Sequence, residues 1–162
     1  MYNYKIANPS LWSISNPYLY KIKTQLVDDS KVLDNFVTTF GIRTISLNLN
    51  TGFWLNSANI KLHGVCMHHD LGSLGAVQNY RALERQVEVL KSFGCNAIRT
   101  SHNPPAPDLL EICDRLGLVV MDEAFDCWNW GKTPTTTVSI SILGFNWMFR
   151  IGSDVTVTTQ VL

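Results

Sequence analysis

The sequence predicts two parts, the end of an antiparallel β-sandwich followed by the opening of a parallel α/β domain. In residues 1–46, apolar and polar side chains alternate with period two, which is typical of antiparallel strands with one face in water. Farther along, short apolar strands alternate with amphipathic helices, and this order predicts a parallel sheet covered by helices. The 162 residues suit one medium domain, or one small domain plus part of another.

The first part contains the expected antiparallel strands. Strands are predicted over residues 11–14 and 18–27, a turn over 28–30, and a further strand or two over 32–45. So few strands make a poor independent sandwich. We therefore expect this part to be the last portion of a sandwich whose beginning is missing.

A short hairpin is predicted next. Its strands cover residues 51–55 and 60–65, and its turn covers 56–59. Ser57 occupies a turn position that Gly would take more easily, because Gly adopts positive φ at no steric cost.

Two amphipathic helices are predicted in the second part. The first covers residues 79–93 and ends at Gly94, with an inner face of Leu83, Val87, Leu90 and Phe93. The second covers residues 106–116 and ends at Gly117, with an inner face of Leu109, Leu110, Ile112, Cys113 and Leu116. Apolar strands at 95–99 and 118–121 alternate with these helices and complete a βαβαβ run.

Polar residues follow three successive strands at the point where each strand ends. They are His68, His69 and Asp70 after the first strand, Arg99 and His102 at the second, and Asp122, Glu123 and Asp126 after the third. Parallel pairing brings the carboxyl ends of strands to one face. Carboxylates and imidazoles bind sugar hydroxyls, and aromatic faces such as Trp128 or Trp130 can cover a sugar ring, so this inventory is typical of a carbohydrate site.

Several of these residues have a second interpretation. His68 and His69 point to opposite sides of an extended segment, so at most one is expected to face a site. Arg99 could instead form a structural ion pair with Asp122 or Glu123, and Glu123 could orient a neighbour rather than act in catalysis. Trp128 could pack the loop instead of stacking on a sugar.

Composition excludes several classes of partner. Thirteen basic residues balance thirteen acidic ones, so neither nucleic acid nor an anionic membrane is expected to bind. No apolar run approaches the length of a membrane span, and the polar start is no signal peptide. The four cysteines lack Cys-x-x-Cys spacing, which predicts buried free thiols rather than zinc ligands and weakly favours a reducing compartment such as the cytoplasm.

Residues 8–132 resemble glycoside hydrolase family 2, and within that family the β-galactosidases. Segments 11–13, 17–20 and 40–43 are similar to the closing strands of the family's immunoglobulin-like domain. Segments 64–72, 96–105, 113–117 and 121–126 are similar to the opening of its TIM barrel. The resemblance implies an immunoglobulin-like part at residues 1–48 and about three of eight barrel strands at 49–132.

The resemblance also implies an activity, the retaining hydrolysis of terminal non-reducing β-D-galactose residues in β-galactosides or oligosaccharides. It implies substrate-binding roles for His68, His102, Arg99, Asp122, Glu123 and Trp128. The family's acid/base and nucleophile lie in segments that have no counterpart here, so we expect this chain to be inactive alone. Some members bind Mg²⁺ beyond the third strand, but residues 125–130 lack the Glu and His that would hold it, so no cofactor is expected. Oligomerisation of a full-length protein is left open.

Residues 133–162 depart from the family pattern and show no sustained period. Family members continue there with a helix and then a strand that begins Arg-Asn-His-Pro-Ser. We expect an aberrant tail, and our hypothesis is a frameshift near residue 134. Alternative interpretations of the chain are a non-catalytic carbohydrate-binding module and a fragment of a β-glucuronidase or β-mannosidase.

Overall fold

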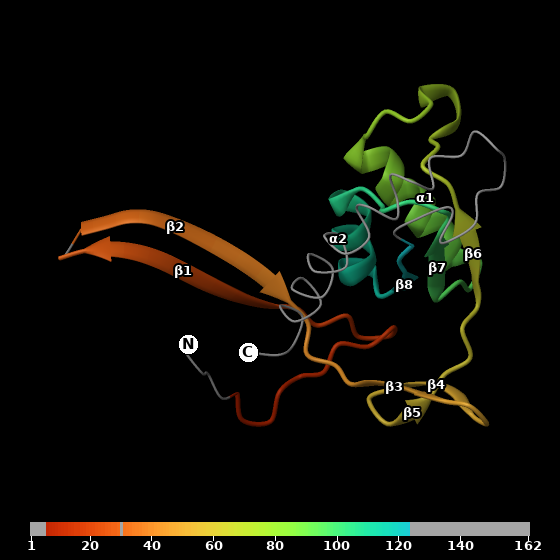
Figure 1. The fold of residues 1–162 in the computed structure, drawn as a ribbon, viewed down its shortest axis with the longest axis horizontal. Coiled ribbons are helices and arrows are strands. Elements are labelled where there is room, and N and C mark those ends of the chain that lie inside the picture. The colour runs from red at the N-terminus through yellow and green to blue at the C-terminus, as the bar shows by residue number, and fades with distance from the viewer. Residues whose placement is uncertain (1–5, 30, 124–162) are drawn as a thin grey trace, which may run out of the picture.

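The computed structural model of the chain describes residues 6–29 and 31–123, which form three sheets and two α-helices (Figure 1). One sheet is a two-stranded antiparallel ribbon, the second is a small antiparallel sheet, and the third is parallel. The predicted tail at residues 133–162 lies outside the described residues.

The ribbon consists of β1 (Tyr20–Asp28) and β2 (Lys31–Phe40) and projects away from the helices in Figure 1. It confirms the strand predicted at residues 18–27 and its antiparallel partner. The prediction that one face of these strands is buried is wrong for the described residues, because Leu26 is 62% exposed and Phe36 is 69% exposed. No second sheet of the described chain packs on the ribbon, so the sandwich stays a prediction.

Residues 11–14 form no strand, contrary to the prediction. Trp12 is instead an anchor: it is 1% exposed, its backbone N–H donates to the carbonyl of Ile42 at 2.8 Å, and its indole Nε1 donates to the carbonyl of Asp114 at 2.7 Å. The apolar pattern at Trp12 therefore reflects packing against the α/β part rather than a sheet ladder.

The second sheet contains β3 (Ile45–Asn48), β4 (Gly52–Leu55) and β5 (Ala58–Asn59). The hairpin turn at Asn56 and Ser57 has φ of 49° and 66°, so Ser57 does occupy a position suited to Gly. The predicted second hairpin strand at residues 60–65 is wrong, because β4 pairs with β3 and with the very short β5.

The parallel sheet has the order β6 (Gly64–Met67), β7 (Ala97–Thr100) and β8 (Val119–Met121). Both pairs of neighbours are parallel, and Arg99 of β7 lies opposite Cys66 on one side and Met121 on the other. This confirms the predicted βαβαβ run. All three strands therefore end at the same edge of the sheet.

Residues at the helix ends explain where both helices begin and end. Helix α1 (Tyr80–Ser92) follows Asn79, whose side chain accepts the N–H of Ala82 at 3.0 Å. Helix α2 (Pro107–Leu116) begins with Pro at its first position and ends at Gly117, which is left-handed at φ 76°. A short 3₁₀ turn (Gly72–Leu74) precedes α1.

One core lies between the helices and the parallel sheet. Its buried members are Leu83, Val87, Ile98, Leu109, Ile112, Cys113 and Leu118. Phe93 does not join them as predicted: it is 83% exposed, because α1 ends at Ser92 and the chain turns away.

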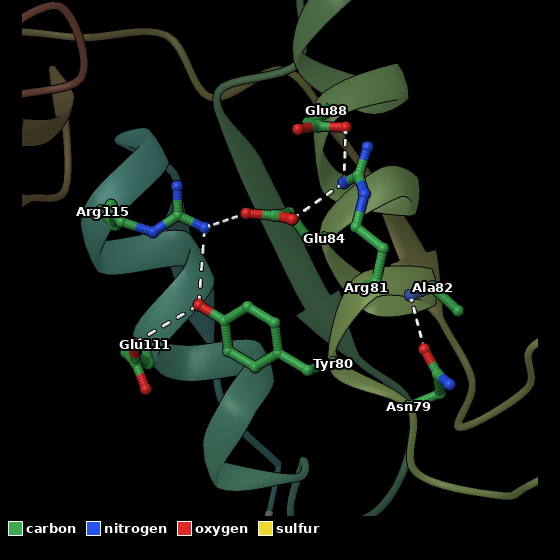
Figure 2. Close-up of polar contacts among 8 residues, drawn as sticks. All are labelled: Asn79, Tyr80, Arg81, Ala82, Glu84, Glu88, Glu111 and Arg115. Atoms are coloured by element: carbon green, nitrogen blue, oxygen red, sulfur yellow. Dashed lines mark hydrogen bonds and ion pairs between the residues drawn. The ribbon is translucent and has the colours of Figure 1, made fainter.

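Polar contacts also join the two helices, as Figure 2 shows. The Glu84 carboxylate of α1 accepts from Arg81 on its own helix and from Arg115 on α2. The Arg115 contacts with Glu84 and with the phenol of Tyr80 link the two helices that cover the sheet.

The cysteines only partly match the prediction of buried thiols. Cys113 is buried, Cys95 is half-buried and Cys66 is exposed, and all three are free. Cys127 lies outside the described residues. None of the helices in the described ranges has the length and apolar character that crossing a bilayer requires.

Candidate functional site

The carboxyl edge of the parallel sheet gathers most of the polar residues that the sequence singles out. His68 follows β6, Ser101 and His102 follow β7, and Asp122 and Glu123 follow β8. The parallel register is the reason, because it brings these three strand ends side by side.

Arg99 is the centre of this edge. Its Nε donates to Glu123 Oε1 at 2.8 Å, and its Nη2 lies 2.7 Å from the same oxygen. Its Nη1 donates to the sulfur of Cys66 at 3.3 Å. The guanidinium therefore has hydrogen-bond partners on both sides. This agrees with the interpretation of Arg99 as the partner in a structural ion pair rather than as a free cation.

His102 is held by the same carboxylate. Its Nδ1 lies 3.0 Å from Glu123 Oε2 and 3.3 Å from Arg99 Nη2. One ring nitrogen cannot both donate and accept, and Arg99 has no acceptor atom, so the shorter contact assigns the proton to Nδ1 as a donor to Glu123. In the neutral ring, Nε2 then keeps its lone pair for an incoming hydroxyl.

The electrostatics of Glu123 follow from these contacts. The hydrogen bond from Arg99, and then that from His102, hold the pKa of the Glu123 carboxyl below its ordinary value. The sulfur of Cys66 and then Glu123 raise the pKa of Arg99. Glu123 is consequently ionised at neutral pH with both oxygens occupied, so it orients His102 and does not supply a proton.

The two adjacent histidines diverge, as predicted. The ring of His68 meets that of His102 edge-on, with 5.9 Å between ring centroids. The His69 ring turns elsewhere, and its Nε2 lies 3.1 Å from the carbonyl oxygen of Ala76. His68 is therefore the member of the pair that lies beside His102.

Asp122 lies at the same edge but contacts a different residue. Its Oδ1 accepts from the hydroxyl of Thr100 at 3.3 Å, and the same hydroxyl accepts the backbone N–H of Glu123 at 3.0 Å. Thr100 thus fixes the segment that carries both carboxylates. Trp128, the remaining predicted substrate-binding residue, lies outside the described residues.

A small cavity lies beneath the loop that follows β7. Its volume is about 30 Å³, enough for one water, and its lining includes Met67, His68, Thr100, Ser101, Pro104 and Leu109. The hydroxyl of Ser101 is buried and has no hydrogen-bond partner among the described residues.

Sequence reasoning missed Cys66 and Thr100 as parts of this edge. Cys66 lies two positions before His68, so period-two alternation already placed both on one face of the strand. The partner of Cys66 was not visible, because Arg99 is 33 residues away and only the register pairs them.

Metal binding finds no support in this part of the chain. Across residues 6–29 and 31–123, no three His, Cys, Asp or Glu side chains gather in a way that could hold an ion. The loop at 125–130, on which the expectation about Mg²⁺ rests, lies outside the described residues.

Family models match both parts of the chain. The model of the TIM barrel domain of glycosyl hydrolases family 2 matches residues 48–139, more than half of the sequence. A second model of glycosyl hydrolases family 2 matches residues 2–43.

Individual relatives agree with these matches. The chain is 54% identical over 128 residues to the β-galactosidase BoGH2A of Bacteroides ovatus, covering 79% of this chain and 15% of that protein. It is 32% identical over 119 residues to a β-glucuronidase of Bacteroides fragilis, covering 73% of this chain and 17% of that protein.

A solved structure is also similar. A glycosyl hydrolase family 2 member from Bacteroides cellulosilyticus superposes with a TM-score of 0.79 at 47% identity, covering 85% of this chain and 18% of the other. The chain therefore spans less than a fifth of the length of each of these three relatives.

Proposed function

The chain belongs to glycosyl hydrolase family 2, and from that premise we propose that it forms one wall of the sugar-binding pocket of a β-galactoside hydrolase. Strands β6, β7 and β8 are, in this proposal, three of the eight strands of a TIM barrel. The ribbon β1–β2 belongs to the end of an immunoglobulin-like domain. The observation that carries the proposal is the convergence of His68, His102 and Glu123 at one sheet edge.

The described residues divide into two roles. His68, the Nε2 of His102 and the second carboxylate oxygen of Asp122 are assigned to the sugar hydroxyls, because the contacts described above leave these atoms unoccupied. The first oxygen of Asp122, Oδ1, already accepts from Thr100. Arg99 and Glu123 are positioning residues, since they fix the tautomer and the direction of the His102 ring.

The chemistry proposed is retaining hydrolysis, in which one carboxyl protonates the leaving oxygen and a second attacks the anomeric carbon. Glu123 fits neither role, because Arg99 and His102 occupy its oxygens and keep it ionised. The other glutamates of the chain, Glu84, Glu88 and Glu111, lie on the two helices. We therefore assign the catalytic carboxylates to other segments of the enzyme.

The charge at the pocket edge favours a neutral sugar. A glucuronide carries a carboxylate that needs a free cation, and Arg99 is the only Lys or Arg that the described residues place in the polar cluster at this edge. Its guanidinium is engaged by Glu123 and Cys66. A galactoside needs only groups that hydrogen-bond its hydroxyls, and the histidines and Asp122 provide such groups. β-Glucuronide hydrolysis is the second candidate, since a relative bears that name.

A chimeric enzyme tests the proposal. The segment of the Bacteroides ovatus β-galactosidase that aligns over 128 residues is replaced by the matching residues of this chain, and the unmodified enzyme is the control. We expect the chimera to hydrolyse p-nitrophenyl β-D-galactoside and to keep the control's preference over the β-D-glucuronide, measured as the ratio of kcat/KM values.

Two results would count against it. A chimera that melts near the control temperature but hydrolyses neither substrate would show that this chain does not form a working pocket wall. A ratio shifted toward the glucuronide would keep the hydrolase and replace the galactoside with a uronic acid.

A further inference from the structure

Thr100 is a buried polar residue at the carboxyl end of β7, next to Arg99. It is 4% exposed, and it lies in phase with Ile98, which belongs to the core between the sheet and the helices. Its side chain therefore lies on the helix-facing side of the sheet, opposite to that of Arg99. Leu83 and Leu109 of the same core line the small cavity together with Thr100. A hydroxyl in such surroundings is unfavourable unless its hydrogen bonds are made.

The Thr100 hydroxyl makes its hydrogen bonds with the segment that follows β8. The pairing of β7 with β8 ends at Arg99 and Met121. Beyond this pair, Thr100 Oγ1 accepts the backbone N–H of Glu123 at 3.0 Å. The single proton of the hydroxyl has two acceptors within reach, Asp122 Oδ1 at 3.3 Å and the carbonyl oxygen of Met121 at 3.5 Å. The shorter contact, which is also the one to a carboxylate, assigns the proton to Asp122.

The two carboxylates of this segment are held by different side chains. Arg99 holds the Glu123 carboxylate, with Nε and Nη2 at 2.8 and 2.7 Å from Oε1. Within residues 6–29 and 31–123, the Thr100 hydroxyl is the only donor at hydrogen-bond distance from the Asp122 carboxylate. The ion pair of Arg99 with Glu123 therefore does not by itself set the direction of Asp122.

We propose that Thr100 is a positioning residue of the sugar pocket and that it acts through Asp122. Its hydroxyl holds Oδ1, so that the second carboxylate oxygen is directed to a sugar hydroxyl. This inference rests on the proposed function, because it needs Asp122 to contact the sugar. Without the Thr100 hydroxyl, the Asp122 side chain samples several rotamers, and binding has to select one of them. The loss falls on substrate binding, so KM should rise more than kcat falls.

Two substitutions in the chimeric enzyme separate the hydroxyl from the volume of the side chain. Thr100→Val keeps the branched shape and removes the hydroxyl, whereas Thr100→Ser keeps the hydroxyl and removes a methyl group. For p-nitrophenyl β-D-galactoside, we expect Thr100→Val to raise KM at least about threefold and Thr100→Ser to raise it less than about twofold. The melting temperature of each variant shows whether it is folded. Equal rises of KM in two variants that melt alike would overturn the proposal.

A double-mutant cycle shows whether Thr100 acts through Asp122. If it does, Thr100→Val should change KM by less than about twofold in a chimera that already carries Asp122→Ala. A residue that only stabilises the fold would give the same factor in both backgrounds. An undiminished effect of Thr100→Val in the Asp122→Ala chimera would therefore overturn the proposal.

Hydrogen exchange separates failure of this proposal from failure of the proposed function. A folded chimera that hydrolyses neither substrate counts against the proposed function, but exchange at the Glu123 amide still tests the contact with Thr100. Measured by mass spectrometry, this exchange should be faster in Thr100→Val than in Thr100→Ser. The amide of Val119, which donates to the carbonyl of Asn96 at 2.9 Å, is the control and should be unchanged. Equal exchange at Glu123 in the two variants would overturn the proposal.

Discussion

Arg99 shows how one side chain can organise the carboxyl edge of the parallel sheet through several polar contacts at once. Its planar guanidinium presents donors in fixed directions, so it can contact a carboxylate, a sulfur and an imidazole at once. These contacts also orient His102, because Glu123 accepts from its Nδ1 while its Nε2 stays available. The polarity of the site therefore depends on a charge pair that is not itself assigned to the substrate.

Replacing Glu123 with Gln should destabilise the chain in a pH-dependent manner. The pKa of the folded Glu123 lies below its ordinary value of 4.5, so its contribution to stability is fully present above that pH and is lost as the pH falls through the lower folded pKa. Urea unfolding should show Glu123→Gln less stable than wild type at pH 7, with the difference vanishing in acid.

Glu111→Gln is the matched control for that measurement, because within residues 6–29 and 31–123 the Glu111 side chain has one long polar contact, from Tyr80 at 3.4 Å. A Glu123→Gln chain as stable as wild type at pH 7, or a difference that persists in acid, would show that the ion pair does not hold this edge.

At the scale of elements, the accuracy of the predictions depends on whether the signal is local. Both helices were predictable within a residue or two, because Asn79 and Gly117 mark their ends in the sequence itself. The strand predicted at residues 60–65 was misplaced, because pairing depends on partners far along the chain. The same reason hid the contact between Cys66 and Arg99, although the common edge of the three strands could be predicted from their order.

The end of α2 also joins the α/β part to the N-terminal segment. The ammonium of Lys91 donates to the carbonyl oxygens of Ile14 and Gly117 at 3.1 and 3.3 Å, and also to that of Leu116. Partial burial lowers the pKa of Lys91. Gly117 lies against the same Ile14 carbonyl, so a side chain there would collide with the segment that Trp12 anchors.

Two glycine substitutions test whether residue 14 packs against the end of α2. A Cβ at Gly94, with φ of 86°, would meet nothing within 4 Å, whereas one at Gly117, with φ of 76°, would lie 2.5 Å from the oxygen of Ile14. Gly94→Ala should therefore lose about 1 kcal/mol from the left-handed backbone alone. Gly117→Ala should lose roughly 1–3 kcal/mol more in denaturant unfolding. Equal losses would contradict the docking of residue 14 on the end of α2.

At the scale of the whole molecule, the chain combines a packed α/β unit with an open ribbon. One face of the ribbon carries Ile22, Leu26 and Phe36, and the described residues provide no sheet to cover it. A three-stranded parallel sheet with helices on one side likewise leaves its other face, the face of Cys66 and Arg99, uncovered by described elements. Both features agree with the proposal that this segment functions within a larger family 2 enzyme.

The coding DNA tests the origin of the tail at residues 133–162. If a frameshift near residue 134 replaced the family's sequence, codons 156–161 read one base earlier should encode Arg-Asn-His-Pro-Ser. Sequencing the gene through these codons decides the matter. Any other pentapeptide in the shifted frame would show that the hypothesis is wrong.

The central claim, that the carboxyl edge of β6–β8 forms the pocket wall, is tested most directly by kcat/KM for p-nitrophenyl β-D-galactoside in the chimeric enzyme. His68 and His102 lie at that edge, and His63 precedes β6 at the opposite edge of the same sheet, where its backbone N–H donates to Asn96. His68→Ala and His102→Ala should each lower kcat/KM by at least about tenfold. His63→Ala should change it by less than about twofold. Equal effects at the two edges, or no loss at His68 and His102, would contradict the account.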